Sequence, residues 1–172
     1  MLVYYRIFWH IIQIVFRDVV VKDVGVRYMG ATAYVDGSYN VKTGAFSYGI
    51  VFFTGAVDSA GNRQELHYSK AFTHPELSEM RNVAGEIMGA AQAMKIAGLL
   101  KIPELTIYHD YEGIAKWCTG EWKTKKPWTR KYRDFYQEMS QTVHITFIKV
   151  KGHSGDRYNE IADALARKAV GN

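Results

Sequence analysis

Four acidic side chains stand where an α/β topology could bring them together. Asp36 and Asp110 each follow a short apolar run that predicts a buried strand, although acidic residues are poor strand formers. Parallel strands of this kind end at one edge of a sheet, where open α/β sheets collect ligands. Glu86 and Asp163 fall on two predicted helices. Grouped carboxylates would offer the oxygen ligands that hard divalent cations prefer.

The stretch ITFIKVKGHSGDRYNEIADALARKA, residues 145–169, is the most informative for this chemistry. It predicts a strand, a glycine-flanked loop containing His153, and a helix that carries Asp163 ten residues later. A polar turn with a surface Asp is the alternative interpretation, and for Glu86 the alternative is a solvated helix carboxylate. Glu86 nevertheless lies among Gly and Ala residues, a pattern that favours close packing.

Two kinds of periodicity predict the elements that must position these residues. Alternating and apolar runs predict five strands, at residues 31–35, 45–53, 64–71, 105–109 and 145–150. Short turns join the first three strands, so we expect an antiparallel meander. Helical spacing predicts the helices, from about Glu79 to Ala97 with Ser78 as N-cap, from Tyr111 to about Trp117, around Tyr132 to Met139, and after His153.

A basic and aromatic segment follows the second predicted helix. GEWKTKKPWTRKYR interleaves six Lys or Arg residues with Trp122, Trp128 and Tyr132. Basic side chains track phosphates, and aromatic rings offer stacking faces to bases or sugars. A solvated helix start with its aromatic residues in the core is the alternative for any one of them.

Length and composition indicate one globular domain with an appendage. The chain has 172 residues, 48% of them hydrophobic, and a formal net charge of +5, which favours a polyanionic partner. Its single cysteine, Cys118, rules out an intrachain disulfide and suits a reducing, cytoplasmic location.

The N-terminal segment has a different character. Residues 1–17 are very apolar, but their longest run without formal charge is about ten residues, and a membrane span needs roughly twenty. The segment predicts either an amphipathic helix for a membrane surface or a protein partner, or a strand; both interpretations stay open. We treat residues 1–28 as an extension and residues 29–172 as the catalytic domain.

Four motifs, taken together and in this order, resemble type 1 ribonuclease H over about residues 31–170. They are YVDGS, RNVAGE, IYHDYEG and VKGHSGDRYNEIADALA. The resemblance implies a ribonuclease H-like fold, a five-stranded mixed sheet flanked by helices. It also implies a metal-dependent endonuclease that cuts the RNA strand of RNA–DNA hybrids and leaves 3′-hydroxyl and 5′-phosphate ends.

The resemblance further implies a role for each acid. Asp36, Glu86, Asp110 and Asp163 would hold two Mg²⁺ ions, with Mn²⁺ as an alternative, and Asp36 would bridge them. His153 would assist proton transfer or product release without ligating. Carboxylates suit this task because Mg²⁺ prefers oxygen ligands, and two ions can serve both the attacking and the leaving oxygen. We expect a monomer with no small-molecule cofactor.

The expected partner is an RNA–DNA hybrid, recognised through ribose 2′-hydroxyls. By resemblance, Asn82 contacts the minor groove, and Gly37 and Ser38 offer backbone groups near the RNA strand. The expected DNA-side residues are Trp117, Trp122, Lys123 and Lys125.

The chain also departs from the family pattern. Arg81 stands where Thr is frequent, so we expect a DNA-phosphate contact of a different kind, and Glu112 stands where Gln is frequent, which adds negative charge near the site. The segment between Asp110 and the Tyr132 helix is too short for a long basic handle.

Other function classes fit parts of the pattern. They are a DNA nuclease of the same superfold, such as a junction resolvase or integrase-like protein, a nonenzymatic hybrid-binding module, and a fragment of a larger protein such as a reverse transcriptase. Four intact acids oppose a binding module, because negative charge facing phosphate would weaken binding.

Overall fold

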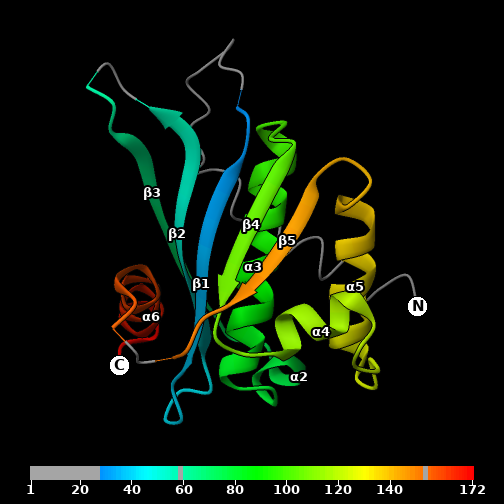
Figure 1. Cartoon of the computed structure of the whole chain (residues 1–172). Coiled ribbons are helices and arrows are strands. Elements are labelled where there is room, and N and C mark those ends of the chain that lie inside the picture. The colour runs from blue at the N-terminus through cyan, green and yellow to red at the C-terminus, as the bar shows by residue number, and fades with distance from the viewer. Residues whose placement is uncertain (1–27, 58–59, 153–154) are drawn as a thin grey trace.

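The computed structural model describes residues 28–57, 60–152 and 155–172. A five-stranded mixed sheet with strand order β3-β2-β1-β4-β5 forms its centre (Figure 1). The strands are β1 (Ala31–Tyr39), β2 (Phe46–Val57), β3 (Arg63–Phe72), β4 (Glu104–His109) and β5 (His144–Lys149). The helices are α2 (Pro75–Ser78), α3 (Asn82–Leu99), α4 (Gly113–Thr119), α5 (Pro127–Met139) and α6 (Arg157–Val170).

The first three strands form the predicted antiparallel meander, and β4 and β5 are parallel to β1. Helices cover both faces: α3, with α4 and α5 beside it, packs on one, and α6 packs over β1, β2 and β3 on the other. The predicted fold class is therefore confirmed. None of the described helices is long and apolar enough to cross a membrane.

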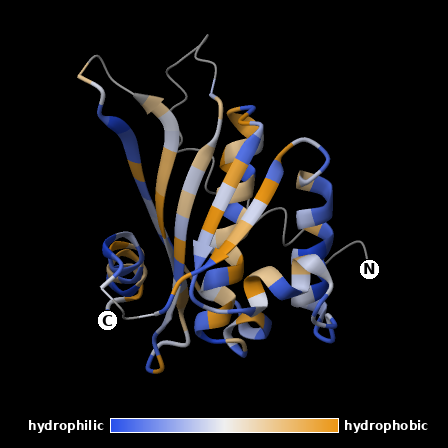
Figure 2. Cartoon of the chain, in the orientation of Figure 1, coloured by the Kyte–Doolittle hydropathy of each residue, from blue (hydrophilic) through white to orange (hydrophobic). Residues whose placement is uncertain are grey.

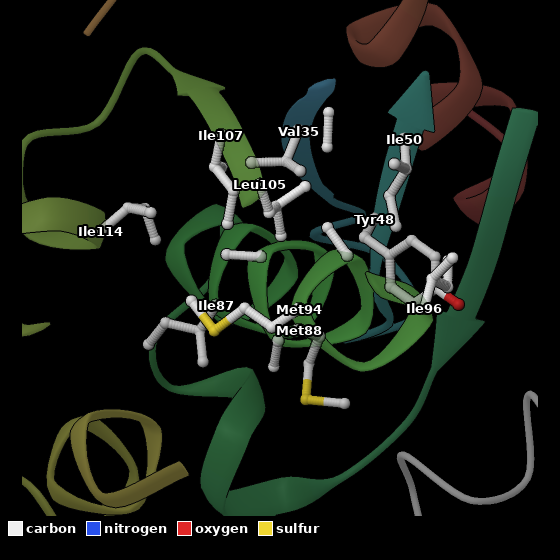
Figure 3. Packing of buried hydrophobic residues seen from close by; sticks show 14 of the residues in the cluster. Val35, Tyr48, Ile50, Ile87, Met88, Met94, Ile96, Leu105, Ile107 and Ile114 are labelled. Carbon is white, nitrogen blue, oxygen red and sulfur yellow. The ribbon is translucent and has the colours of Figure 1, made fainter. Parts of the chain in front are cut away.

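The main core lies between the sheet and α3. Val35 and Ile107 project from their strands toward α3, where Val35 packs beside Gly89, and Ile87 and Met94 lie on the side of this helix that faces away from the strands (Figure 3). Residues 84–97 of α3 are buried without a break, which explains the weak amphipathic pattern of this helix and its many small residues. Polar residues instead dominate the edge strand β3 and much of α5 (Figure 2).

The predicted start of the long helix was wrong. A separate turn, α2, begins at Pro75, and α3 begins only at Asn82, after Arg81 adopts the unusual backbone angles φ 52° and ψ −129°. Ser78 is not an N-cap, because its hydroxyl donates a 2.7 Å hydrogen bond to the Gly44 carbonyl. Tertiary contact with the β1–β2 turn thus overrides the local capping signal.

Candidate active site

Asp36 lies within β1 rather than at its end, which corrects the sequence prediction. The antiparallel pairing with β2 continues to Tyr39, whereas the parallel pairing with β4 stops at Tyr34 opposite Tyr108. Asp36 therefore follows the last parallel pair by two residues, and Asp110 lies two residues past Tyr108. The two carboxylates meet where the parallel strands separate.

Alternation along β1 directs Asp36 and Gly37 to opposite faces. Asp36 is paired with Gly49, so both residues are directed to the same face of the sheet. This face is the one covered by α6, since a β-carbon at Gly49 would collide with the Ala162 carbonyl. Gly37 faces α3, where a β-carbon would collide with the Asn82 carbonyl and lie 2.6 Å from the Glu86 nitrogen. The missing side chain lets α3 approach so closely that Glu86 reaches the carboxylate of Asp36.

Three carboxylates form a compact group at this edge of the sheet. Oxygen atoms of Asp36, Glu86 and Asp110 all lie within 4.8 Å of one another. Asp36 and Glu86 are only 8% and 5% exposed, and Asp110 is half-buried. Gly152, just after β5, packs on the third acid, since a β-carbon there would lie 2.6 Å from Asp110 Oδ2.

Burial and mutual repulsion make ionisation of Asp36 and Glu86 energetically costly. Burial, followed by the nearby charge of Asp110, raises the pKa of Asp36 to about 7, although the Gly37 N–H donates a 2.7 Å hydrogen bond to its carboxylate. Burial, then Asp110 and Asp36, raises the pKa of Glu86 well above its usual value. Glu86 Oε2 is buried without a hydrogen-bond partner among the described residues. A bound cation would relieve both penalties, so the donor set fits a hard divalent metal.

Asp163 comes to the same region from α6 but is not in the three-carboxylate group. Its charge acts on Asp36, yet its Oδ2 forms an ion pair with Arg167 Nη2, one helical turn later and 2.6 Å away. His153 lies outside the described residues, as does the segment 1–27. The structure therefore brings three of the five predicted catalytic residues into direct proximity and places a fourth nearby.

The residues expected to meet the RNA strand surround Gly37. Asn82 is exposed at the first turn of α3, in backbone contact with Gly37. Ser38 is buried, and its hydroxyl accepts a 3.2 Å hydrogen bond from Asn172, so its side chain anchors the end of the chain. Arg81 is exposed beside Asn82, at the N-terminus of α3.

The residues expected on the DNA side lie around a cleft of about 320 Å³ between the start of α3, α4 and the start of α5. Trp117, Lys123 and Lys125 line it, with Tyr111 and Lys126 among the other lining residues. Trp117 is largely buried. Trp122 is 37% exposed and packs edge-on against Trp117, with ring centroids 6.0 Å apart. A short segment, residues 120–126, joins α4 to α5 in place of a long handle.

Two lysines balance the negative charge that Glu112 was expected to add near the site. Its carboxylate accepts a 2.6 Å hydrogen bond from Lys116 and a 3.0 Å hydrogen bond from Lys149. These lysines lower the pKa of Glu112 to about 2 and balance its charge. The three side chains also connect the start of α4 to the end of β5.

Sequence reasoning missed Arg167, the two lysines that bind Glu112, and the side of the cleft formed by Glu79, Met80 and Val83. The Asp163–Arg167 and Glu112–Lys116 pairs follow the i,i+4 spacing of helical ion pairs, a signal that could have identified them. Lys149 is 37 residues from Glu112, and the cleft joins three separate segments. Neither relationship has a local signal.

Comparisons with known proteins agree with this architecture. The family model described as RNase H matches residues 29–171. A ribonuclease H from Prosthecochloris aestuarii is 30% identical over 152 residues, covering 81% of this chain and 94% of that protein.

Two solved structures share the fold. RNase H1 from the halophilic archaeon Halobacterium salinarum NRC-1 has a TM-score of 0.64 at 22% identity, covering 82% of this chain and 97% of that one. LC11-RNase H1, solved in complex with an RNA/DNA hybrid, has a TM-score of 0.60 at 18% identity, covering 81% of this chain and 99% of that one. The chain belongs to the RNase H family and is a ribonuclease H enzyme.

Proposed function

We propose that this ribonuclease hydrolyses the RNA strand of RNA–DNA hybrids in a reaction that depends on two divalent metal ions, with Mg²⁺ as the expected ion and Mn²⁺ as the alternative. The products would carry 3′-hydroxyl and 5′-phosphate ends. The observation that carries the proposal is the group of three carboxylates with oxygen atoms within 4.8 Å of one another. The orphaned buried Oε2 of Glu86 supports it, because an uncompensated buried carboxylate oxygen is costly without a cation.

Each acid has a distinct place in this mechanism. Asp36, between the helices on the two faces, would be shared by both ions. Glu86 and Asp110 would hold the ion on the leaving-group side, and Asp163 the ion on the side of the attacking water. Two ions held by these residues would supply activation of the attacking water and stabilisation of the leaving oxygen. His153 would assist proton transfer or product release.

Recognition of the hybrid would use both sides of the site. Asn82 and the backbone of Gly37 and Ser38 would face the RNA strand, whose 2′-hydroxyls distinguish it from DNA. Trp122, Trp117, Lys123 and Lys125 would contact the DNA strand, and Arg81 would add a phosphate contact of its own. The hybrid bound in the LC11-RNase H1 structure supports the choice of substrate. We expect the enzyme to act as a monomer in the cytoplasm.

A cleavage assay tests the proposal. The protein is incubated with Mg²⁺ or Mn²⁺ and end-labelled RNA–DNA hybrid, duplex DNA, branched DNA, duplex RNA or single strands. Cutting of the hybrid's RNA strand alone is the expected result. Cutting of branched DNA would instead indicate a resolvase-like nuclease. Binding of the hybrid without cutting would indicate a nonenzymatic module.

A further inference from the structure

Arg167 is a cationic side chain close to the acids that the proposed mechanism does not use. Arg167 Nη2 lies 2.6 Å from Asp163 Oδ2, on the next turn of α6. Its charge also acts on Asp36, where it opposes the effect of the neighbouring carboxylates. In the metal-free protein, the positive charge of Arg167 thus offsets part of the repulsion among the carboxylates, as a bound cation would.

The backbone around this pair is held firmly against the sheet. A β-carbon at Gly49 would lie 2.7 Å from the Ala166 nitrogen, and the Ser47 hydroxyl donates a 2.6 Å hydrogen bond to the Ala166 carbonyl. These contacts fall between Asp163 and Arg167, so α6 has little freedom to shift as a whole. Asp163 can approach Asp36 mainly by rotation of its side chain, away from Arg167.

We propose that Arg167 competes with a divalent ion for the carboxylate of Asp163, and so sets the metal concentration at which the site becomes fully occupied. This inference rests on the proposed function, because it assigns Asp163 to the metal site. Arg167 acts through Asp163 and is a positioning residue; it need not touch the substrate.

The exposure of the pair determines the size of the effect. The Arg167 side chain is 56% exposed and that of Asp163 is 16% exposed, so water and salt screen much of their attraction. Such a pair tunes metal binding without preventing it. Removing the arginine should strengthen binding of the weaker ion about two- to fivefold, an amount expected for a partly exposed ion pair.

The test is isothermal titration of the metal-free protein with Mg²⁺ and with Mn²⁺, in low salt and in 0.5 M salt. Arg167→Met removes the charge and keeps much of the side-chain length, and Arg167→Gln is a second variant in case the first folds poorly. Lys168→Met is the matched control, because it removes one positive charge from the adjacent exposed position of α6. Asp36→Asn reports whether the titration detects the acidic site at all.

The expected result is tighter metal binding in both Arg167 variants, wild-type binding in Lys168→Met, and a smaller difference at high salt. Unchanged or weaker binding in the Arg167 variants would overturn the inference, as would equal tightening in Lys168→Met. In both cases, if Asp36→Asn loses metal binding, the proposal of a metal site at Asp36 still stands and only the inference about Arg167 fails. If the wild-type protein binds neither ion, the proposed function and this inference both fail.

Discussion

Gly37 of β1 and Glu86 of α3 are in backbone contact, with 2.6 Å between the position of a Gly37 β-carbon and the Glu86 nitrogen. Gly85, the residue before Glu86, is packed just as tightly, because a β-carbon there would collide with the Ser47 carbonyl. Asp36 and Glu86 therefore approach each other because two glycines allow a helix to lie directly on the sheet.

Gly37→Ala should impair both stability and metal binding. The added methyl group must push α3 away from β1, which costs roughly 1–3 kcal/mol or more in a packed core. Thermal unfolding and metal titration measure the two effects. Gly30→Ala is the control, because its β-carbon would have no neighbour closer than 3.6 Å. A Gly37→Ala protein that melts and binds metal like the wild type would show that the helix contact does not set the site.

Asp36→Asn should abolish hybrid cleavage without lowering the melting temperature of the metal-free protein. The substitution removes a buried charge beside Glu86 and Asp110, so the metal-free fold should be as stable as the wild type or more stable. Asp110→Asn should behave in the same way. Cleavage assays and thermal unfolding in EDTA provide the comparison, and a large drop in melting temperature would make these residues structural.

The stability of the metal-free protein should fall as the pH rises from about 4 to about 8. The pKa of Asp36 is 3.8 in its reference state and about 7 in the fold, so the native state binds the proton more tightly than the unfolded state. This contribution is complete below the lower value and is lost as the pH passes the upper one, with a limit of about 4 kcal/mol for three pKa units.

Chemical denaturation in EDTA across this pH range measures the loss. Asp36→Asn is the control, because its free energy of unfolding should fall less with rising pH than that of the wild type. Mg²⁺ should restore stability most strongly near pH 8, where Asp36 is ionised. If the free energy of unfolding depends on pH in the same way in the wild type and in Asp36→Asn, the raised pKa of Asp36 is contradicted.

Lys123→Ala and Lys125→Ala should each weaken hybrid binding and leave the chemical step largely intact. Both side chains line the cleft beside Trp117, where they can neutralise phosphates. Each substitution should raise KM more than it lowers kcat, and should reduce the slope of log affinity against log salt by about one. Arg63→Ala, at the start of β3, removes an equal charge and should have little effect. Equal losses in all three variants would indicate a general charge effect.

His153→Ala should lower turnover without removing it, because the proposed role of this side chain is proton transfer or product release and not metal ligation. Steady-state and single-turnover cleavage rates separate these steps. Metal affinity should stay at the wild-type value, and unchanged turnover would contradict the role.

The sequence predicted those features of the site that depend on local pattern. Asp36 and Asp110 could be placed together because each follows an apolar run of strand-forming residues, and Glu86 could be placed inward because its neighbours are small. The start of α3 could not be predicted, since Ser78 binds the distant Gly44 carbonyl and Arg81 adopts a positive φ angle. The cleft was also beyond sequence reasoning, because its walls come from three separate segments.

The separation of β1 from β4 after Tyr34 and Tyr108 has an evolutionary consequence. Asp36 and Asp110 receive their location from hydrogen-bond register within the sheet, so substitutions on the outer helix surfaces can accumulate without moving them. Solved proteins that share only 16–22% of their residues with this chain can therefore keep the same scaffold. Selection on such an enzyme should act hardest on a few glycines and acids and leave the rest of the chain free to drift.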